Sequence, residues 1–162
     1  MPRAFGAAGP YEKIAGRLRF EVDERMNRNG EVERALDSEE VARVVDLLLA
    51  ENVEAIAVCL LHSYANPAHE RVIKKIVQQR APRMILSISS DVLPEIKEYE
   101  RTSTTVINAY VKPIVAKYLE SLIGDLKGID VRAPLLLMQS NGGLTTAEAA
   151  AEMPMNIIES GP

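Results

Sequence analysis

Five consecutive residues, 139–143 (QSNGG), form the segment of this sequence best suited to binding an anion. They follow the apolar residues 135–138, and Thr145 and Glu148 then have the spacing of a helix capping box. The two glycines would let the backbone approach an anion closely, and the following helix would offer unpaired N–H groups to phosphate or an oxyanion. An ordinary glycine turn is the alternative, because neither GxxxxGK[ST] nor GxGxxG occurs.

A second polar segment, residues 98–105 (EYERTSTT), lies directly before a predicted helix. Its threonines are natural helix caps, and Arg101 could clamp a carboxylate or a phosphate through two parallel hydrogen bonds. Helix capping combined with a surface ion pair is the alternative. Asn108 falls among apolar neighbours in the helix, so its side chain must face solvent or find a buried partner.

The histidines and the cysteine give weaker signals. His62 follows an apolar run, residues 55–61, and His69 lies in the first turn of the next predicted helix. Two histidines without a third clustered ligand do not make a metal site, so none is assigned. Cys59 lies inside the apolar run and is predicted to be a small core residue with a raised pKa rather than a nucleophile.

Composition limits the class of protein that could carry these residues. The chain has 162 residues, 47% hydrophobic and 26% charged, which suits one folded domain or one lobe of a larger protein. Nineteen basic and 23 acidic residues give a net charge of -4, which argues against nucleic acid as a partner. The longest apolar run is too short to span a membrane, and no signal peptide is evident, so we expect a cytoplasmic protein.

Hydrophobic periodicity predicts the elements that must position these residues. Residues 17–36 are predicted to form an antiparallel hairpin around an Asn-Gly turn, beginning with a strand at 17–22. A helix over 38–51, capped by Asp37 and Glu40, precedes a buried strand at 55–61.

Strands and helices continue to alternate in the second half of the chain. A helix opening at Pro67 and a strand at 83–88 complete a strand–helix–strand crossover, which implies a parallel sheet. Residues 101–125 have helical spacing, and Pro113 inside them predicts a kink or two abutting helices. A last strand is predicted at 155–158. The class is therefore α/β, with a mostly parallel sheet, helices on its faces and an N-terminal hairpin.

Four ordered motifs resemble the hydantoinase A/5-oxoprolinase family. They are residues 55–70 (AIAVCLLHSYANPAHE), 98–113 (EYERTSTTVINAYVKP), 138–143 (MQSNGG) and 159–162 (ESGP). The resemblance implies an actin-like ATPase (ribonuclease H-like) fold. Residues 17–162 would form part of its N-terminal lobe and end at the crossover to the second lobe, with residues 1–16 an unassigned tail.

The resemblance also implies an activity. It implies ATP-dependent hydrolysis of a cyclic amide of the hydantoin or 5-oxoproline type, with the ring opened through a phosphorylated carbonyl. ATP and magnesium are the implied cofactors of the full-length enzyme, and a hydantoinase B-type subunit is the implied protein partner. A ketone carboxylase subunit, or a non-catalytic assembly module docking on a partner subunit, are the alternatives.

The sequence departs from the family pattern because it contains no Asp-x-Gly-Gly phosphate loop. We therefore expect an internal piece of a longer enzyme, which by itself holds no nucleotide and is inactive. Catalytic residues are not assigned. The candidate residues of a nucleotide or substrate cleft are Arg101, Thr102, Asn108, Gln139, Ser140, Asn141, Gly142, Gly143, Glu159, Ser160 and Gly161.

Overall fold

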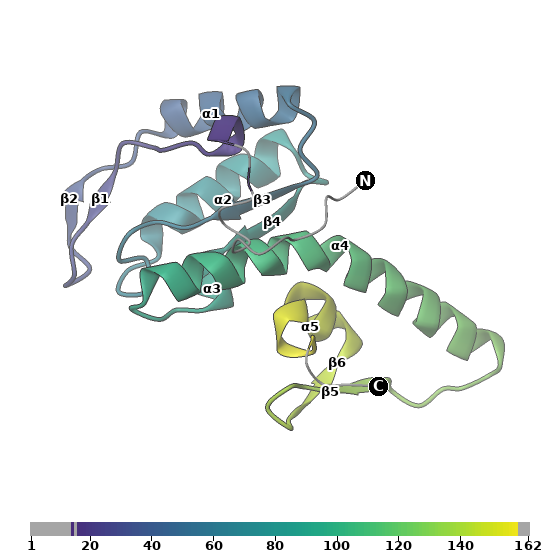
Figure 1. Ribbon diagram of the computed structural model, residues 1–162. Helices are drawn as coiled ribbons and strands as arrows, with labels where there is room; N and C mark the ends of the chain where they lie inside the picture. Colours follow the sequence, from purple (N-terminus) through teal and green to yellow (C-terminus); the bar gives the residue numbers. More distant parts are fainter. Residues whose placement is uncertain (1–13, 15, 159–162) are drawn as a thin grey trace. The chain divides into compact units, whose positions relative to one another are not determined.

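The computed structural model describes residue 14 and residues 16–158 of the chain (Figure 1). It forms two compact units, Met1–Ala109 and Tyr110–Pro162. The predicted tail, residues 1–16, lies almost wholly outside the described residues, and its assignment stays a prediction.

The first unit is built on a pair of parallel strands. Its elements in chain order are η2 (Gly16–Leu18), β1 (Arg25–Met26), β2 (Val32–Arg34), α1 (Ser38–Ala50), β3 (Ala55–Val58), α2 (Ala68–Arg80), β4 (Ile85–Ile88), α3 (Ser89–Val92) and the first part of α4 (Glu98–Gly128). β3 and β4 run parallel, with Ala55 opposite Ile85 and Val58 opposite Ile88. The predicted crossover through α2 is confirmed.

The pleat of the two strands separates an apolar face from a more polar one. Ile56, Val58 and Ile88 pack with buried valines and isoleucine of α1 and α2 into the hydrophobic core. Ser87 points to the opposite face, because successive side chains of a strand alternate. On that face it meets Asn108 of α4, and in Figure 1 the first part of α4 lies across the strands from α1.

The N-terminal hairpin is confirmed at its turn but is shorter than predicted. β1 and β2 pair antiparallel around Asn29 and Gly30, and the Gly30 φ of +81° is one that glycine adopts without strain. The strand predicted at 17–22 is wrong, because residues 16–18 form a 3-10 helix and no strand follows until β1. Alternating side chains indicate a strand only where another strand supplies backbone partners, and no strand in the described part of the chain pairs with this segment.

Helix boundaries lie close to the predicted ones, whereas their caps differ. α1 begins at Ser38 because Asp37 accepts a hydrogen bond from the Glu39 N–H at 2.9 Å. The expected reciprocal partner, Glu40, instead accepts from the Asp23 N–H at 2.8 Å and so ties the hairpin to the helix. α2 begins at Ala68, one residue later than predicted.

α4 is a single helix from Glu98 to Gly128 and continues through Pro113. Of the two predicted outcomes, two abutting helices is therefore wrong. Pro113 has no N–H to donate to the carbonyl of Ala109, so the helix lacks one backbone hydrogen bond at that turn. No helix among the described residues is long and apolar enough to cross a membrane.

The second unit contains an antiparallel pair and a short helix. β5 (Leu136–Met138) pairs with β6 (Leu144–Thr146), and α5 (Ala147–Glu152) and η3 (Pro154–Asn156) follow. The strand predicted at 155–158 is wrong, because a proline opens a 3-10 turn there. Thr146, rather than Thr145, caps α5 by accepting from Ala149 N–H at 3.3 Å. The α/β class is confirmed, with β3–β4 as its parallel sheet.

Candidate functional site

Buried polar side chains gather where β3 and β4 end. We call this group the carboxyl-edge cluster; its members are Ser63, Glu70, Ser87, Ser89, Arg101 and Asn108, each at most 4% exposed. The carboxyl ends of parallel strands are where ligands bind in open α/β sheets. All six residues belong to the first unit, so their positions relative to one another are defined.

Glu70 is the centre of the cluster and is fully buried. Its Oε1 accepts from the Leu60 N–H at 2.9 Å and the Ser89 hydroxyl at 2.6 Å, and its Oε2 accepts from the Ser90 N–H at 2.8 Å. Because the Ser89 proton is given to Glu70, the Ser63 hydroxyl at 3.0 Å must donate to Ser89. One carboxylate therefore joins the loop after β3 to α3, the short helix after β4.

Arg101 lies in the first turn of α4 and is 1% exposed. Its Nη2 donates to the Leu60 carbonyl at 2.9 Å and its Nη1 to the Glu95 carbonyl at 3.3 Å. The guanidinium lies over the Tyr64 ring, 5.7 Å from its centroid, and its Nε has no hydrogen-bond partner among the described residues. The surface ion pair considered from the sequence is therefore wrong.

Two further contacts attach α4 to the strands. Asn108 donates from Nδ2 to the Ser87 hydroxyl at 3.0 Å, which supplies the buried partner that the sequence required. Cys59 follows β3, and burial raises its pKa to about 11, while hydrogen bonds from Thr105 and Thr102 partly oppose that rise. The predicted rise in the pKa of Cys59 is confirmed in its direction, whereas Cys59 is half-buried and lies outside the hydrophobic core. Thr102 is placed beside the strand end.

The two histidines make different contacts. His62 adopts a φ of +59° in the turn after β3, and its ring meets Tyr64 edge-on. His69 is buried, and its Nδ1 lies 2.6 Å from Oε2 of Glu24. Among the described residues no three histidine, cysteine or acidic side chains are grouped as metal ligands.

The glycine turn lies in the second unit and joins two antiparallel strands. The sequence predicted that it would lead directly into a helix, but β6 intervenes before α5. The N–H groups of Gln139, Gly142 and Gly143 donate within the turn, and that of Ser140 donates to the Asn156 carbonyl. Gly142 has a φ of +87° and open space around its Cα. The turn therefore does not present a row of free amides to a phosphate.

The sequence-predicted residues thus fall into three groups. Arg101, Thr102 and Asn108 meet at the carboxyl edge of β3 and β4, in the first unit. Residues 139–143 stay together in the second unit, as a hairpin turn. Residues 159–161 lie outside the described residues, and their role stays a prediction.

Sequence reasoning missed Glu70, Ser87 and Ser89. A signal for Glu70 was present, because it lies three and seven residues before Ile73 and Val77, on the buried face of α2. An acidic residue on an apolar stripe must find several donors or remain uncharged. The serines carried no such signal, because serine is common in short strands and turns.

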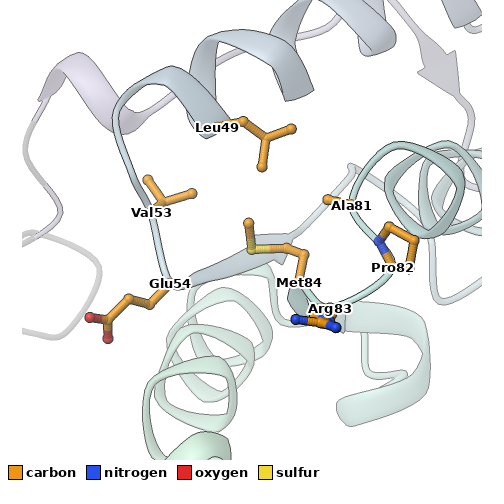
Figure 2. Close-up of a pocket in the computed structure, with 7 residues that line it drawn as sticks. All are labelled: Leu49, Val53, Glu54, Ala81, Pro82, Arg83 and Met84. Atoms are coloured by element: carbon orange, nitrogen blue, oxygen red, sulfur yellow. The ribbon is translucent and has the colours of Figure 1, made fainter.

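A cavity lies at the opposite end of the parallel strands. Its volume is about 430 Å³, and Leu49, Val53 and Met84 supply most of its apolar lining. Figure 2 shows that the carboxylate of Glu54 points away from its centre. No set of polar groups converges on this cavity, so the carboxyl-edge cluster remains the candidate site.

Comparisons with known proteins agree with this fold and these motifs. The hydantoinase/oxoprolinase N-terminal region matches residues 8–81, and the hydantoinase/oxoprolinase domain matches residues 101–162. The crystal structure of ATP-dependent caprolactamase from Pseudomonas jessenii superposes with a TM-score of 0.75 at 28% identity, over 83% of this chain and 20% of that one. A nucleotide-free acetone carboxylase structure superposes with a TM-score of 0.72 at 26% identity, over 85% and 20%.

Sequence relatives lead to the same class. An uncharacterized protein of Methanocaldococcus jannaschii is 40% identical over 94% of this chain and 22% of its own length. Caprolactamase subunit alpha of Pseudomonas jessenii is 32% identical over 90% and 21%, and 5-oxoprolinase of Saccharomyces cerevisiae is 34% identical over 72% and 9%. The fold and motifs therefore define an α/β lobe of the kind found in ATP-dependent amide hydrolases and ketone carboxylases.

The chain belongs to the hydantoinase/oxoprolinase family. It spans about a fifth of the length of the first two of these relatives.

Proposed function

We propose that this chain serves an ATP-dependent enzyme that hydrolyses a cyclic amide. The observation that carries the proposal is the family match over residues 8–81 and 101–162, together with the structural likeness to caprolactamase. Caprolactam and 5-oxoproline, after which two of the relatives are named, are both cyclic amides. A hydantoin is a cyclic amide as well, so one substrate class accounts for these names.

The chain's own residues would form one wall of the substrate site. Arg101, Thr102 and Asn108 lie at the strand ends, where ligands of α/β sheets collect. The Arg101 Nε has no hydrogen-bond partner among the described residues, so a substrate oxygen could accept from it after a small side-chain shift. Residues 139–143 and 159–161 are proposed, from the motifs alone, as nucleotide- or substrate-binding residues of the complete enzyme.

The described residues do not by themselves suit a nucleotide. Four of the turn amides, those of Gln139, Ser140, Gly142 and Gly143, already have acceptors, and no metal-ligand group is assembled in the described part of the chain. We therefore propose ATP and magnesium for the complete enzyme, and assign no step through them to these residues. The support is that both solved relatives are described as ATP-dependent.

A partner subunit also forms part of the proposal. Relatives of this chain are named as the alpha subunit of caprolactamase, the gamma subunit of acetophenone carboxylase and the beta subunit of acetone carboxylase. We propose that this protein likewise works with a second subunit of the hydantoinase B type, in the cytoplasm. Co-purification of that subunit with the tagged protein would test this part.

Substrate-dependent ATP consumption tests the proposed reaction. The complete enzyme would be incubated with ATP, magnesium and either hydantoin, 5-oxoproline or caprolactam, while phosphate release and ring-opened product are measured. We expect one of the cyclic amides to raise phosphate release in step with product formation. The 162-residue chain by itself is expected to release none.

Two results would contradict the proposal. Phosphate release that responds to a ketone with bicarbonate, and to no cyclic amide, would establish the carboxylase alternative. An enzyme that ignores nucleotide and all of these substrates, yet retains a partner subunit, would establish the assembly module.

A further inference from the structure

We infer that Glu70 is a positioning residue that sets where Arg101 and the first turn of α4 lie, acting through the backbone of Leu60. The inference rests on the proposed function only for the role of Arg101 in binding a substrate. It concerns a residue of α2 that ends the first motif but is not among the candidate residues of the cleft.

The first step is the number of hydrogen bonds that Glu70 accepts. Its carboxylate has three donors, which are the backbone N–H groups of Leu60 and Ser90 and the hydroxyl of Ser89. These donors lie in the loop after β3 and in α3 after β4, two segments that the hydrogen bond between Ser63 and Ser89 also connects. A carboxylate suits this task because both of its oxygens only accept hydrogen bonds, whereas a glutamine would direct an N–H₂ group at one of the donors.

The second step is the backbone of Leu60. Its N–H donates to Glu70 and its carbonyl accepts from Nη2 of Arg101, both at 2.9 Å. Leu60 is thus held on its two sides by residues of different helices. A shift of the Leu60 backbone would move the carbonyl that the guanidinium needs.

The third step is what else holds Arg101. No carboxylate forms an ion pair with it among the described residues, and its remaining partners are the Glu95 carbonyl, at a longer 3.3 Å, and the Tyr64 ring. Leu60 therefore supplies the shortest contact to a guanidinium that is 1% exposed. A buried cation is costly to leave without acceptors, so its side chain should follow the Leu60 carbonyl.

Neighbouring polar residues strengthen the same junction. Ser63 donates to Ser89, and the Asn66 side chain donates to the Gly30 carbonyl at 2.8 Å. His69 is paired with Glu24. Most of the polar side chains in the segment 62–70 therefore bind groups outside it, which is the arrangement expected of a segment that joins loops rather than one that binds a ligand.

Nuclear magnetic resonance of the 162-residue protein can test the inference without nucleotide or substrate. Amide hydrogen exchange is measured at Leu60 and Ser90, and the guanidinium signals of Arg101 are followed in parallel. The variants are Glu70→Gln and Arg101→Lys, with Ile73→Val as a control that loosens α2 without touching the cluster. Because each lost hydrogen bond is expected to speed exchange about tenfold, the effects are measurable.

Each variant has its own expected pattern. Glu70→Gln should speed exchange at both Leu60 and Ser90, because its amide nitrogen cannot accept and its neutral oxygen accepts more weakly than a carboxylate oxygen. It should also shift the Arg101 signals. Arg101→Lys should speed exchange at Leu60, because the Leu60 carbonyl loses its contact with the guanidinium. It should leave Ser90 unchanged, because the hydrogen bond from Ser90 to Glu70 does not involve Leu60. Ile73→Val should leave the exchange rates of Leu60 and Ser90 as they are in the wild type.

The inference is overturned if Arg101→Lys leaves Leu60 unchanged, or if it speeds Leu60 and Ser90 equally. It is also overturned if Glu70→Gln leaves the Arg101 signals where they were. Should Glu70→Gln fail to fold, Arg101→Lys decides alone. None of these measurements uses a cyclic amide, so failure of the proposed function would leave the result standing.

Discussion

Among single residues, Cys59 shows how burial controls chemistry. Its thiol lies directly after β3, where removal from water raises its pKa from 9.0 to about 11. A thiol reacts as the thiolate, and at neutral pH the neutral form dominates strongly. The residue therefore contributes packing and hydrogen bonding beside Thr102 and Thr105 rather than nucleophilic chemistry.

We expect Cys59 to make the folded protein lose stability in alkaline solution. The raised pKa means that the unfolded chain ionises first, so this contribution is complete below about pH 9 and is lost as the pH rises toward 11. Urea unfolding of wild type and Cys59→Ala between pH 8 and 11 measures it. Over this pH range the free energy of unfolding should fall by up to about 2 kcal/mol more in the wild type than in the variant. Parallel curves of unfolding free energy against pH would contradict the prediction.

The contact between Asn108 and Ser87 should couple α4 to the sheet measurably. Asn108→Ala is expected to reduce the free energy of unfolding by about 1–3 kcal/mol, because a buried hydroxyl then loses its donor. Ser87→Ala and the double variant complete a mutant cycle, and the coupling should be about 1 kcal/mol. A coupling near zero would show that the two side chains contribute independently.

At the level of elements, the N-terminal hairpin is attached by its turn to the segment before α2. Gly30 has a φ of +81°, and its carbonyl accepts from the Asn66 side chain. An added Cβ would lie 3.2 Å from the Ala65 carbonyl oxygen and 3.3 Å from the Asn66 Cβ. Both the backbone conformation and the close approach therefore favour glycine.

Gly30→Ala is expected to destabilise the protein by more than a positive φ alone explains. Gly142→Ala is the matched control, because Gly142 has a similar φ of +87° but nothing within 4 Å. We expect the control to cost about 1 kcal/mol and Gly30→Ala clearly more. Denaturant unfolding compares them, and equal losses would show that the contacts with Ala65 and Asn66 give way freely.

Pro113 should weaken the helix that contains it. Pro113→Ala restores an N–H to the Ala109 carbonyl, and we expect it to raise the free energy of unfolding by about 1–3 kcal/mol. Pro82→Ala, in the turn before β4, is the control and should slightly destabilise, because it only frees the unfolded chain. A loss of stability in Pro113→Ala would mean that the packing around α4 depends on the proline.

For the whole molecule, the second unit leaves apolar surface in water. Leu136, Met138 and Leu144 are 49%, 59% and 64% exposed. Met138 and Leu144 are opposite each other in the register, and Leu136 is two residues from Met138, so all three share one face of the β5–β6 pair. A two-stranded sheet with such a face has few partners for its apolar side chains.

This face, rather than the strand predicted at 155–158, should cause any weak self-association of the chain. Met138→Thr combined with Leu144→Thr keeps strand-forming residues and removes apolar area. We expect the double variant to lower concentration-dependent association in sedimentation equilibrium. Ile96→Thr, which changes a 71% exposed residue outside this face, is the control and should leave association unchanged.

Local patterns in the sequence determined the α/β class, most helix boundaries, the Asn-Gly turn and the buried strand pair. Those features depend on hydrophobic periodicity and on capping or turn residues within a few positions of one another. The predicted strands at 17–22 and 155–158 were wrong because a strand also needs a neighbour, which a local pattern cannot supply. The family, and with it the proposed reaction, came from four motifs in order.

Only the tertiary structure decided which polar side chains meet. Glu70 reaches Leu60, Ser89 and Ser90 because α2 crosses between two strands that pair in parallel. The sequence predicted that Arg101 clamps an anion or forms a surface ion pair, yet packing buries it and its Nη1 and Nη2 donate to backbone carbonyls. Residues 10 to 41 positions apart become neighbours only when burial of the shared apolar core brings their elements together. The free energy gained by burying that core depends on the whole fold, so no local stretch of sequence determines it.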